Sequence, residues 1–166
     1  TVRRTREAGA DALVAAAPSR LDEMLAWGTT TCEVKSGYGL TTASELKQLR
    51  VVRTLDAQHP IDLVPTFLGA HDVPPEYRAR REAYVALVIE EMLPRVADEG
   101  LAEWCDVFCE RGVFSPDESI AILRAASRLG LKARVHADEL GLTGGSRVAA
   151  AVGARAADHL VFVDQD

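Results

Sequence analysis

The chain has 166 residues, of which 48% are hydrophobic and 27% are charged, with a formal net charge of −6, and this is typical of one globular domain. The acidic balance and the lack of a basic cluster argue against nucleic-acid binding, and no apolar run is long enough to cross a bilayer. The three cysteines do not have the spacing of a disulfide framework, so a reducing cytoplasm is the expected location.

Short apolar runs and amphipathic stretches alternate along the chain. In chain order, the predicted elements are a helical region at 1–27 broken at Pro18, a strand at 29–34, a helix from 42, a strand at 61–68, a helix at 77–96, a strand at 106–109, a helix from 115 to Gly130, a strand at 132–136, a short helix at 146–152 and a strand at 158–163. None of the strands alternates cleanly between apolar and polar residues, as expected for strands buried on both faces.

Two of the helices have recognisable start signals. Thr42-Ala-Ser-Glu45 has the pattern of a capping box, in which the first and last side chains bind the free amides of the first turn. Ser115-Pro116-Asp117-Glu118 is a second capping box with proline at the first helical position. The Gly144-Gly145 pair before the short helix could bind an anion at that helix N-terminus.

This order of elements predicts a parallel α/β sheet with right-handed crossovers. The sheet could be an open doubly wound one or part of a (β/α)8 barrel. Five βα units are too few to close an eight-stranded barrel, and the chain starts with a helix and stops after a strand. We therefore expect residues 1–166 to form one piece of a larger barrel.

Two histidines stand at equivalent ends of neighbouring predicted strands. His136 ends the strand at 132–136, and His159 lies at the start of the apolar run that follows. Because equivalent ends of parallel strands lie side by side, both imidazoles can face one pocket. Imidazole is a common metal ligand and the usual acid or base near neutral pH, so the pair predicts a hydrolytic site with a metal.

Carboxylates beside these histidines are candidates for proton transfer. Glu139 and Asp138 closely follow His136, and each could orient a substrate, move a proton or simply face water. Asp158 precedes His159 and should point to the opposite face if the strand is regular.

The ends of the first two predicted strands carry further candidates. Tyr38 stands between glycines that allow a sharp turn, so a binding role and a plain turn both remain open. His71 follows the second strand, where a solvated loop position is the alternative to a site. Lys35 could form a Schiff base with a carbonyl substrate or pair with Glu33 or Glu110.

Taken together, these residues resemble the imidazolonepropionase family of the amidohydrolase superfamily, enzymes of histidine breakdown. The matching segments are Glu-Val-Lys-Ser-Gly-Tyr-Gly-Leu (33–40), Thr-Phe-Leu-Gly-Ala-His (66–71), Asp-Val-Phe-Cys-Glu (106–110), His-Ala-Asp-Glu-Leu (136–140) and Ala-Asp-His-Leu (157–160). They occur in the family's order and at its approximate spacing.

The resemblance implies a (β/α)8 barrel that hydrolyses 4-imidazolone-5-propanoate to N-formimidoyl-L-glutamate with one zinc or iron ion. On this match His136 is the metal ligand, and His159 assists proton transfer together with Glu139. Tyr38, His71 and Glu139 match positions that contact the substrate. The implied partners are a small-molecule substrate and a second copy of the chain, with no nucleic acid and no membrane.

The chain also departs from the family pattern. The His-x-His pair of the first strand, the aspartate after the last strand and a substrate-binding arginine are missing. We therefore interpret the chain as strands two to six of the barrel, inactive by itself. The alternatives are another metal-dependent amidohydrolase or deaminase, an aldolase that uses Lys35, and a non-catalytic barrel fragment.

Overall fold

The computed structural model describes residues 1–164; residues 165–166, which the predicted fragment includes, lie outside the described part. A five-stranded parallel sheet forms its centre, with the spatial order β1-β2-β3-β4-β5. The strands are β1 (Thr31–Lys35), β2 (Asp62–Ala70), β3 (Trp104–Cys109), β4 (Lys132–Ala137) and β5 (Ala156–His159). The spatial order equals the chain order, so each strand is added beside the one before it.

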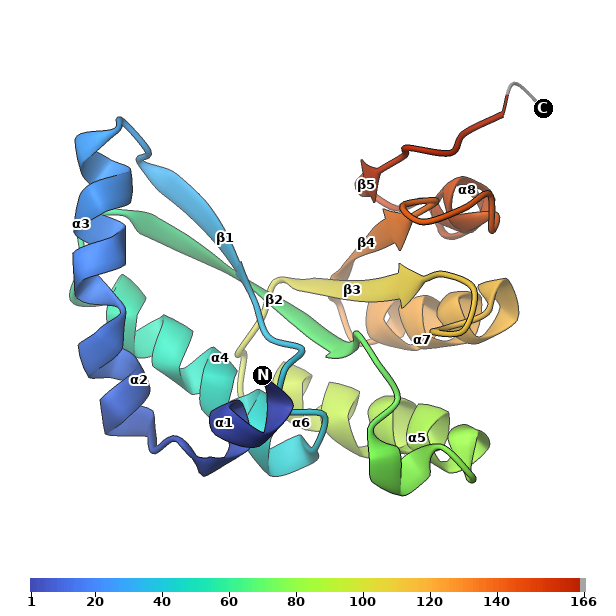
Figure 1. Cartoon of the computed structure of the whole chain (residues 1–166), viewed down its shortest axis with the longest axis horizontal. Coiled ribbons are helices and arrows are strands. Elements are labelled where there is room, and N and C mark those ends of the chain that lie inside the picture. Colours follow the sequence, from blue (N-terminus) through green and yellow to red (C-terminus); the bar gives the residue numbers. More distant parts are fainter. Residues whose placement is uncertain (165–166) are drawn as a thin grey trace.

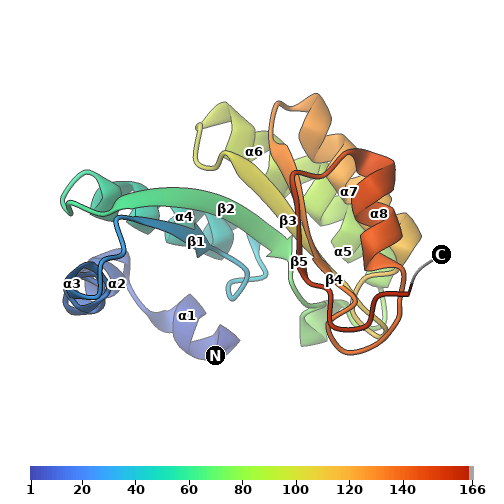
Figure 2. The same cartoon turned by 90° about the horizontal axis from the view of Figure 1, so that it is seen from above.

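The sheet curls into half of a barrel, with the later helices along its convex side (Figure 1; Figure 2). The helices are α1 (Val2–Glu7), α2 (Ala10–Ala16), α3 (Pro18–Ala26), α4 (Thr42–Asp56), α5 (Arg81–Leu87), α6 (Leu93–Asp98), α7 (Pro116–Arg128) and α8 (Gly145–Val152), together with a short 3-10 turn η1 (Pro75–Tyr77) and a π-helical segment η2 (Val88–Met92). An open doubly wound sheet would reverse its strand order and carry helices on both faces, so the partial barrel is the confirmed prediction. No described helix has both the length and the apolar character that a bilayer crossing requires.

The main core lies between the convex face of the sheet and the helices that cover it. Its largest buried side chains include Phe67, Tyr84, Phe114 and Leu123. A smaller core, which includes Leu21, packs α3 against α4 and the first two strands. The concave face is different, because its strand positions carry charged and polar side chains, and these form the candidate site described below.

The prediction of a regular helix at 77–96 has to be corrected. The helix begins at Arg81, after the separate turn η1, and then runs without a break through α5, the π segment η2 and α6. Pro94 gives the physical reason for the π segment, since it has no N–H to donate to the carbonyl of Glu90 and its ring crowds that carbonyl. A wider π turn just before the proline relieves this conflict.

The last predicted strand is a second correction. β5 spans Ala156–His159 rather than 158–163, because His159 and Leu160 have φ angles of +72° and +53°, which no extended strand accommodates. Residues 161–163 then run past the strand end as exposed chain. The other four predicted strands agree with the structure to within two residues at each end.

The two start signals have different outcomes. The capping box at Ser115 is confirmed, with reciprocal hydrogen bonds between Ser115 and Glu118. The one at Thr42 is wrong: Thr41 caps α4 by accepting from Ser44 N at 3.3 Å. The Glu45 side chain instead binds the loop that precedes the helix.

Candidate active site

Five ring side chains form a row along the C-terminal edge of the half-barrel. In spatial order they are Tyr38, His71, Phe108, His136 and His159. The centroid distances between successive rings are 4.8, 6.1, 5.8 and 5.0 Å. The predicted site residues therefore come together as expected, from the ends of β1, β2, β4 and β5, with Phe108 of β3 between them.

Glu139 closes one end of this row. Its carboxylate Oε2 lies 3.5 Å from Nε2 of His159, and both side chains are about one-third exposed. The left-handed φ of His159, +72°, ends β5 at this residue. Two groups that can exchange a proton thus stand together, at an edge that solvent and a small molecule can reach.

A charged cluster fills the concave face beside His136. Lys35 Nζ lies 2.6 Å from Asp106 Oδ2 and 2.9 Å from Asp158 Oδ2. Arg134 lies 3.2 Å from the second oxygen of Asp158 and 3.3 Å from Glu33. These residues come from β1, β3, β4 and β5, so strand register brings them together.

The contacts within the cluster shift the pKa values of Lys35, Asp106 and Asp158 in the directions that favour their charged forms. Burial alone would lower the pKa of Lys35, but Asp106, Asp158 and Glu33 outweigh burial and raise it above its ordinary value. Burial alone would raise the pKa of Asp106, yet its contacts with His136 and Lys35 hold it lower than usual. In the same way, Lys35 and Arg134 outweigh the effect of burial and lower the pKa of Asp158.

The predicted pairing of Lys35 with Glu33 is confirmed, and the other two predictions for Lys35 are corrected. A Schiff base requires a neutral amine, and the raised pKa keeps this amine protonated. Glu33 is a partner at 3.4 Å, but the closest partners are Asp106 and Asp158, which the sequence did not indicate. Glu110 is not a partner: it accepts the N–H groups of Arg111 and Leu140 instead.

Replacing Lys35 by methionine is expected to lower the free energy of unfolding by about 3–5 kcal/mol, because two carboxylates of a partly buried cluster lose their counter-charge. Lys35→Arg keeps the charge and should lose much less. The raised lysine pKa and lowered carboxylate pKa values make this contribution complete between about pH 4 and pH 10. This stabilisation is lost as the pH falls through the lowered pKa values of Asp106 and Asp158, or rises through the raised pKa of Lys35. Urea unfolding of both variants tests this, and a methionine variant as stable as the native protein at pH 7 would contradict it.

Asp106 also contacts His136. Its Oδ2 lies 2.8 Å from Nδ1 of the imidazole, and its Oδ1 accepts the backbone N–H of His136 at 3.2 Å. The Nδ1 contact is short but does not have the geometry of a well-aligned hydrogen bond. Because Nδ1 faces Asp106, Nε2 is the nitrogen left for a ligand at the strand end.

Asp106, His136 and Asp158 offer three ligand atoms within 4.8 Å of one another. A metal between them would compete with the Lys35 ammonium, which already neutralises both carboxylates. The donor chemistry therefore fits one metal ligand, the imidazole of His136, better than a complete three-residue site.

Asp138 does not belong to the site, although it lies beside Glu139 in sequence. Its carboxylate accepts the backbone N–H groups of Thr143, Gly144, Gly145 and Ser146 at 2.8–3.2 Å. Burial alone would raise its pKa, but these amides hold it far below its usual range. The anion predicted at the start of α8 is therefore the protein's own side chain.

Along its whole length the chain is similar to curated proteins named imidazolonepropionase. It is 51% identical to the protein of Alkaliphilus metalliredigens over 166 residues, 56% identical to that of Symbiobacterium thermophilum over 167 residues, and 53% identical to that of Clostridium tetani over 166 residues. The chain is therefore similar to one segment of these imidazolonepropionases.

The match covers all of the present chain but only 39–40% of the length of those relatives. No family model matches the chain. The half-barrel agrees with a partial match, because five βα units supply only part of the strands that a closed eight-stranded barrel needs.

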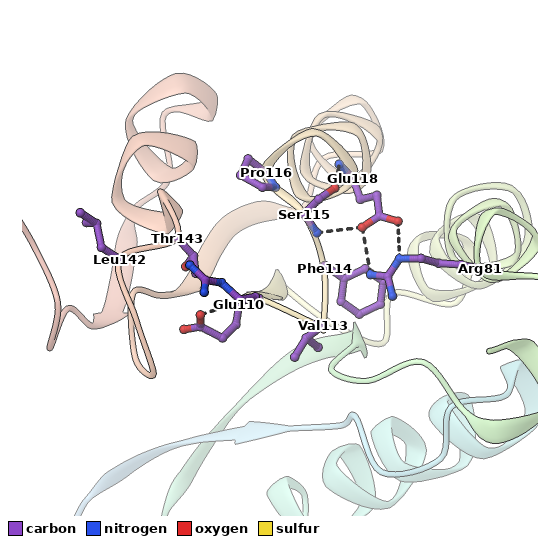
Figure 3. Close-up of a pocket in the computed structure, with 11 residues that line it drawn as sticks. Arg81, Glu110, Val113, Phe114, Ser115, Pro116, Glu118, Leu142 and Thr143 are labelled. Atoms are coloured by element: carbon purple, nitrogen blue, oxygen red, sulfur yellow. Dashed lines mark hydrogen bonds and ion pairs between the residues drawn. The ribbon is translucent and has the colours of Figure 1, made fainter. Parts of the chain in front are cut away.

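The structure also has a cavity of about 510 Å³ (Figure 3). It is bounded by the loop after β3, the start of α7 and Leu142–Thr143, with Arg81 and Glu118 paired along one side. None of the five ring residues lines it. The ring row and this cavity are therefore two separate features of the surface.

Sequence reasoning missed two residues of this segment that shape the site. Asp106 is an acid within a buried strand, Trp104–Cys109, and a charge in such a run is rarely present without a partner. The charge of Asp106 within an apolar run could therefore have indicated a buried ion pair from the sequence alone. Arg134 occupies the equivalent place in β4, but only the strand register shows that it meets Glu33 and Asp158.

Proposed function

We propose that this chain forms the central part of an imidazolonepropionase that hydrolyses 4-imidazolone-5-propanoate to N-formimidoyl-L-glutamate. The observation that carries the proposal is the row from Tyr38 to His159, which places three histidines, a tyrosine and Glu139 along one edge of a half-barrel. The identity of 51–56% with proteins of that name supports the choice of substrate.

His136 would hold one metal ion, zinc or iron, through Nε2, with further ligands from parts of the enzyme outside this chain. When bound, the ion would polarise the ring carbonyl and make water a stronger nucleophile. Asp106 would keep the imidazole turned in the required direction through its contact with Nδ1.

Glu139 and His159 would handle the protons of the reaction. Hydrolysis joins the water oxygen to the ring carbonyl carbon, breaks the adjacent C–N bond and delivers one proton to the leaving nitrogen. Glu139 stands within 3.5 Å of His159 Nε2, so the two side chains could accept the water proton and return it to that nitrogen.

Tyr38 and His71 would orient the substrate at the other end of the row. The rings of Tyr38 and His71 meet edge to face at an interplanar angle of 79°, and Tyr38 is 44% exposed. An exposed hydroxyl and an imidazole held in contact could bind the polar groups of a small anionic substrate.

Residues 1–166 would be one piece of the catalytic barrel, and the partner would be a small-molecule substrate. The location would be the cytoplasm, which the three free cysteines support.

A substrate panel on the complete enzyme tests the proposed reaction. Loss of imidazolone absorbance, with N-formimidoyl-L-glutamate identified by mass spectrometry, is the expected result. Deamination of nucleobase-like rings without imidazolone turnover would assign the site to a different amidohydrolase. Borohydride trapping of a carbonyl substrate on Lys35 would overturn the hydrolase mechanism itself.

A further inference from the structure

The loop that carries Tyr38 is held in a tight and unusual conformation. Gly37 has a φ of +109°, and a Cβ at this position would lie 2.9 Å from the carbonyl oxygen of Leu68 and 3.1 Å from His71 Cβ. A Cβ on Gly39 would lie 2.6 Å from Ser44 Cβ. The loop between β1 and α4 is therefore pressed between the end of β2 and the start of α4.

Glu45, in the first turn of α4, binds this loop through hydrogen bonds. The residue is 0% exposed, and its carboxylate accepts three backbone N–H groups of the loop: Gly37 at 2.8 Å, Gly39 at 2.8 Å and Leu40 at 2.7 Å. None of the ion pairs among the described residues includes Glu45. A buried carboxylate without an ion pair is costly to keep. Its three hydrogen bonds hold the loop amides in a geometry that an apolar side chain could not fix.

The opposite side of the loop faces the ring row. The carbonyl oxygen of Gly37 lies 3.0 Å from His71 Nδ1, and the ring of Tyr38 packs against the ring of His71 with centroids 4.8 Å apart. Glu45 touches neither ring, but the backbone that it binds contacts one and carries the other.

We propose that Glu45 is a positioning residue: its buried carboxylate sets the loop that places Tyr38 and His71 for substrate binding. This rests on the proposed function for the roles of Tyr38 and His71. The carboxylate fixes three amides at once, so the loop is arranged before the substrate arrives. Substrate binding then does not have to order it.

Glu45→Gln in the complete enzyme is the main test. The substitution preserves shape, but the new NH2 group replaces one of the two acceptor oxygens and faces a loop N–H. KM for imidazolone-propanoate should rise about ten-fold, with kcat within about two-fold and metal content unchanged. Amide hydrogen exchange at Gly37, Gly39 and Leu40 should become faster.

Thr41→Ala is the matched control. It removes the side-chain cap of the same helix, α4, without touching the loop amides. It should lower the midpoint of thermal unfolding and leave KM at the native value. A Glu45→Gln variant that behaves like this control, less stable but with native KM, would show a purely structural role and overturn the proposal.

Two further comparisons separate the possible failures. Tyr38→Phe should also raise KM, and the double variant should show less than the product of the two single effects, because both act through the same ring. Native KM in Tyr38→Phe would remove the proposed role of Tyr38 and this inference with it. A raised KM there with native KM in Glu45→Gln would overturn the inference alone.

One measurement needs no variant. The amides of Gly37, Gly39 and Leu40 should exchange slowly in the native protein, and exchange at the rate of an open loop would overturn the proposal. If Glu45→Gln does not fold, Glu45→Asp keeps the charge but shortens its reach. It should still raise KM, and a native value would count against the proposal.

Discussion

Replacing His136 by alanine is expected to remove the bound metal and all measurable turnover from the complete enzyme. His136 Nδ1 lies 2.8 Å from a buried carboxylate, which leaves Nε2 for a ligand, and metal-bound histidines commonly have a carboxylate beside their other nitrogen. Losing a direct ligand should weaken metal binding by more than the roughly 10- to 100-fold that outer contacts contribute.

His159→Ala is the matched comparison, because the two rings are neighbours with centroids 5.0 Å apart. This variant should keep its metal and lose roughly 10²- to 10⁴-fold in kcat, the usual contribution of a proton-transfer group. Metal analysis of both purified variants, with circular dichroism to check folding, decides between the roles. Equal metal loss in both would make His159 a ligand as well, and full metal retention in His136→Ala would exclude His136.

Glu139→Gln is expected to lower kcat strongly in the complete enzyme, by roughly 10²- to 10⁴-fold, because an amide cannot accept the water proton. If the carboxylate acts mainly in the transition state, kcat and kcat/KM should fall together. Metal content should stay at the native level, since Glu139 contacts His159 and not His136.

Glu103→Gln is a suitable control for that variant. Glu103 is exposed, pairs with Lys132 at 3.2 Å and precedes β3 at the opposite end of the strands from the site. Its kinetics should be native. Steady-state rates measured side by side for the two variants test the role, and a native kcat in Glu139→Gln would return this carboxylate to the solvent-facing interpretation.

The fold was predictable because its main signals are local. Buried parallel strands appear as apolar runs of characteristic length, and a capping box such as Ser115–Glu118 marks a helix start directly. The failures have causes that lie outside the local pattern. The apolar run from Leu160 to Val163 resembles a strand, yet the left-handed φ of His159 and Leu160 turns the chain away.

The ring row was predictable for a geometric reason. Residues at the C-terminal ends of parallel strands must meet at one edge, so Tyr38, His71, His136 and His159 could be placed together without knowing any contact. The cluster of Lys35, Asp106 and Asp158 could not, because it depends on the register of three strands far apart in sequence.

One carboxylate was placed incorrectly, and the role of another was left open, for a related reason. Glu45 fits the last position of a capping box, but the helix starts one residue earlier and its side chain binds the preceding loop. Asp138 was a candidate beside Glu139, but its φ of +49° turns its carboxylate toward the start of α8. Sequence spacing alone does not show which way such a side chain points.

The most direct test of the whole account is the turnover of 4-imidazolone-5-propanoate by the complete enzyme before metal removal, after removal with a chelator, and after addition of zinc or iron. The account predicts turnover in the native enzyme, its loss on removal, and its recovery once one ion has been taken up per chain, with no recovery in His136→Ala. Undiminished turnover by metal-free native enzyme, or recovery in His136→Ala equal to the native enzyme, would contradict it.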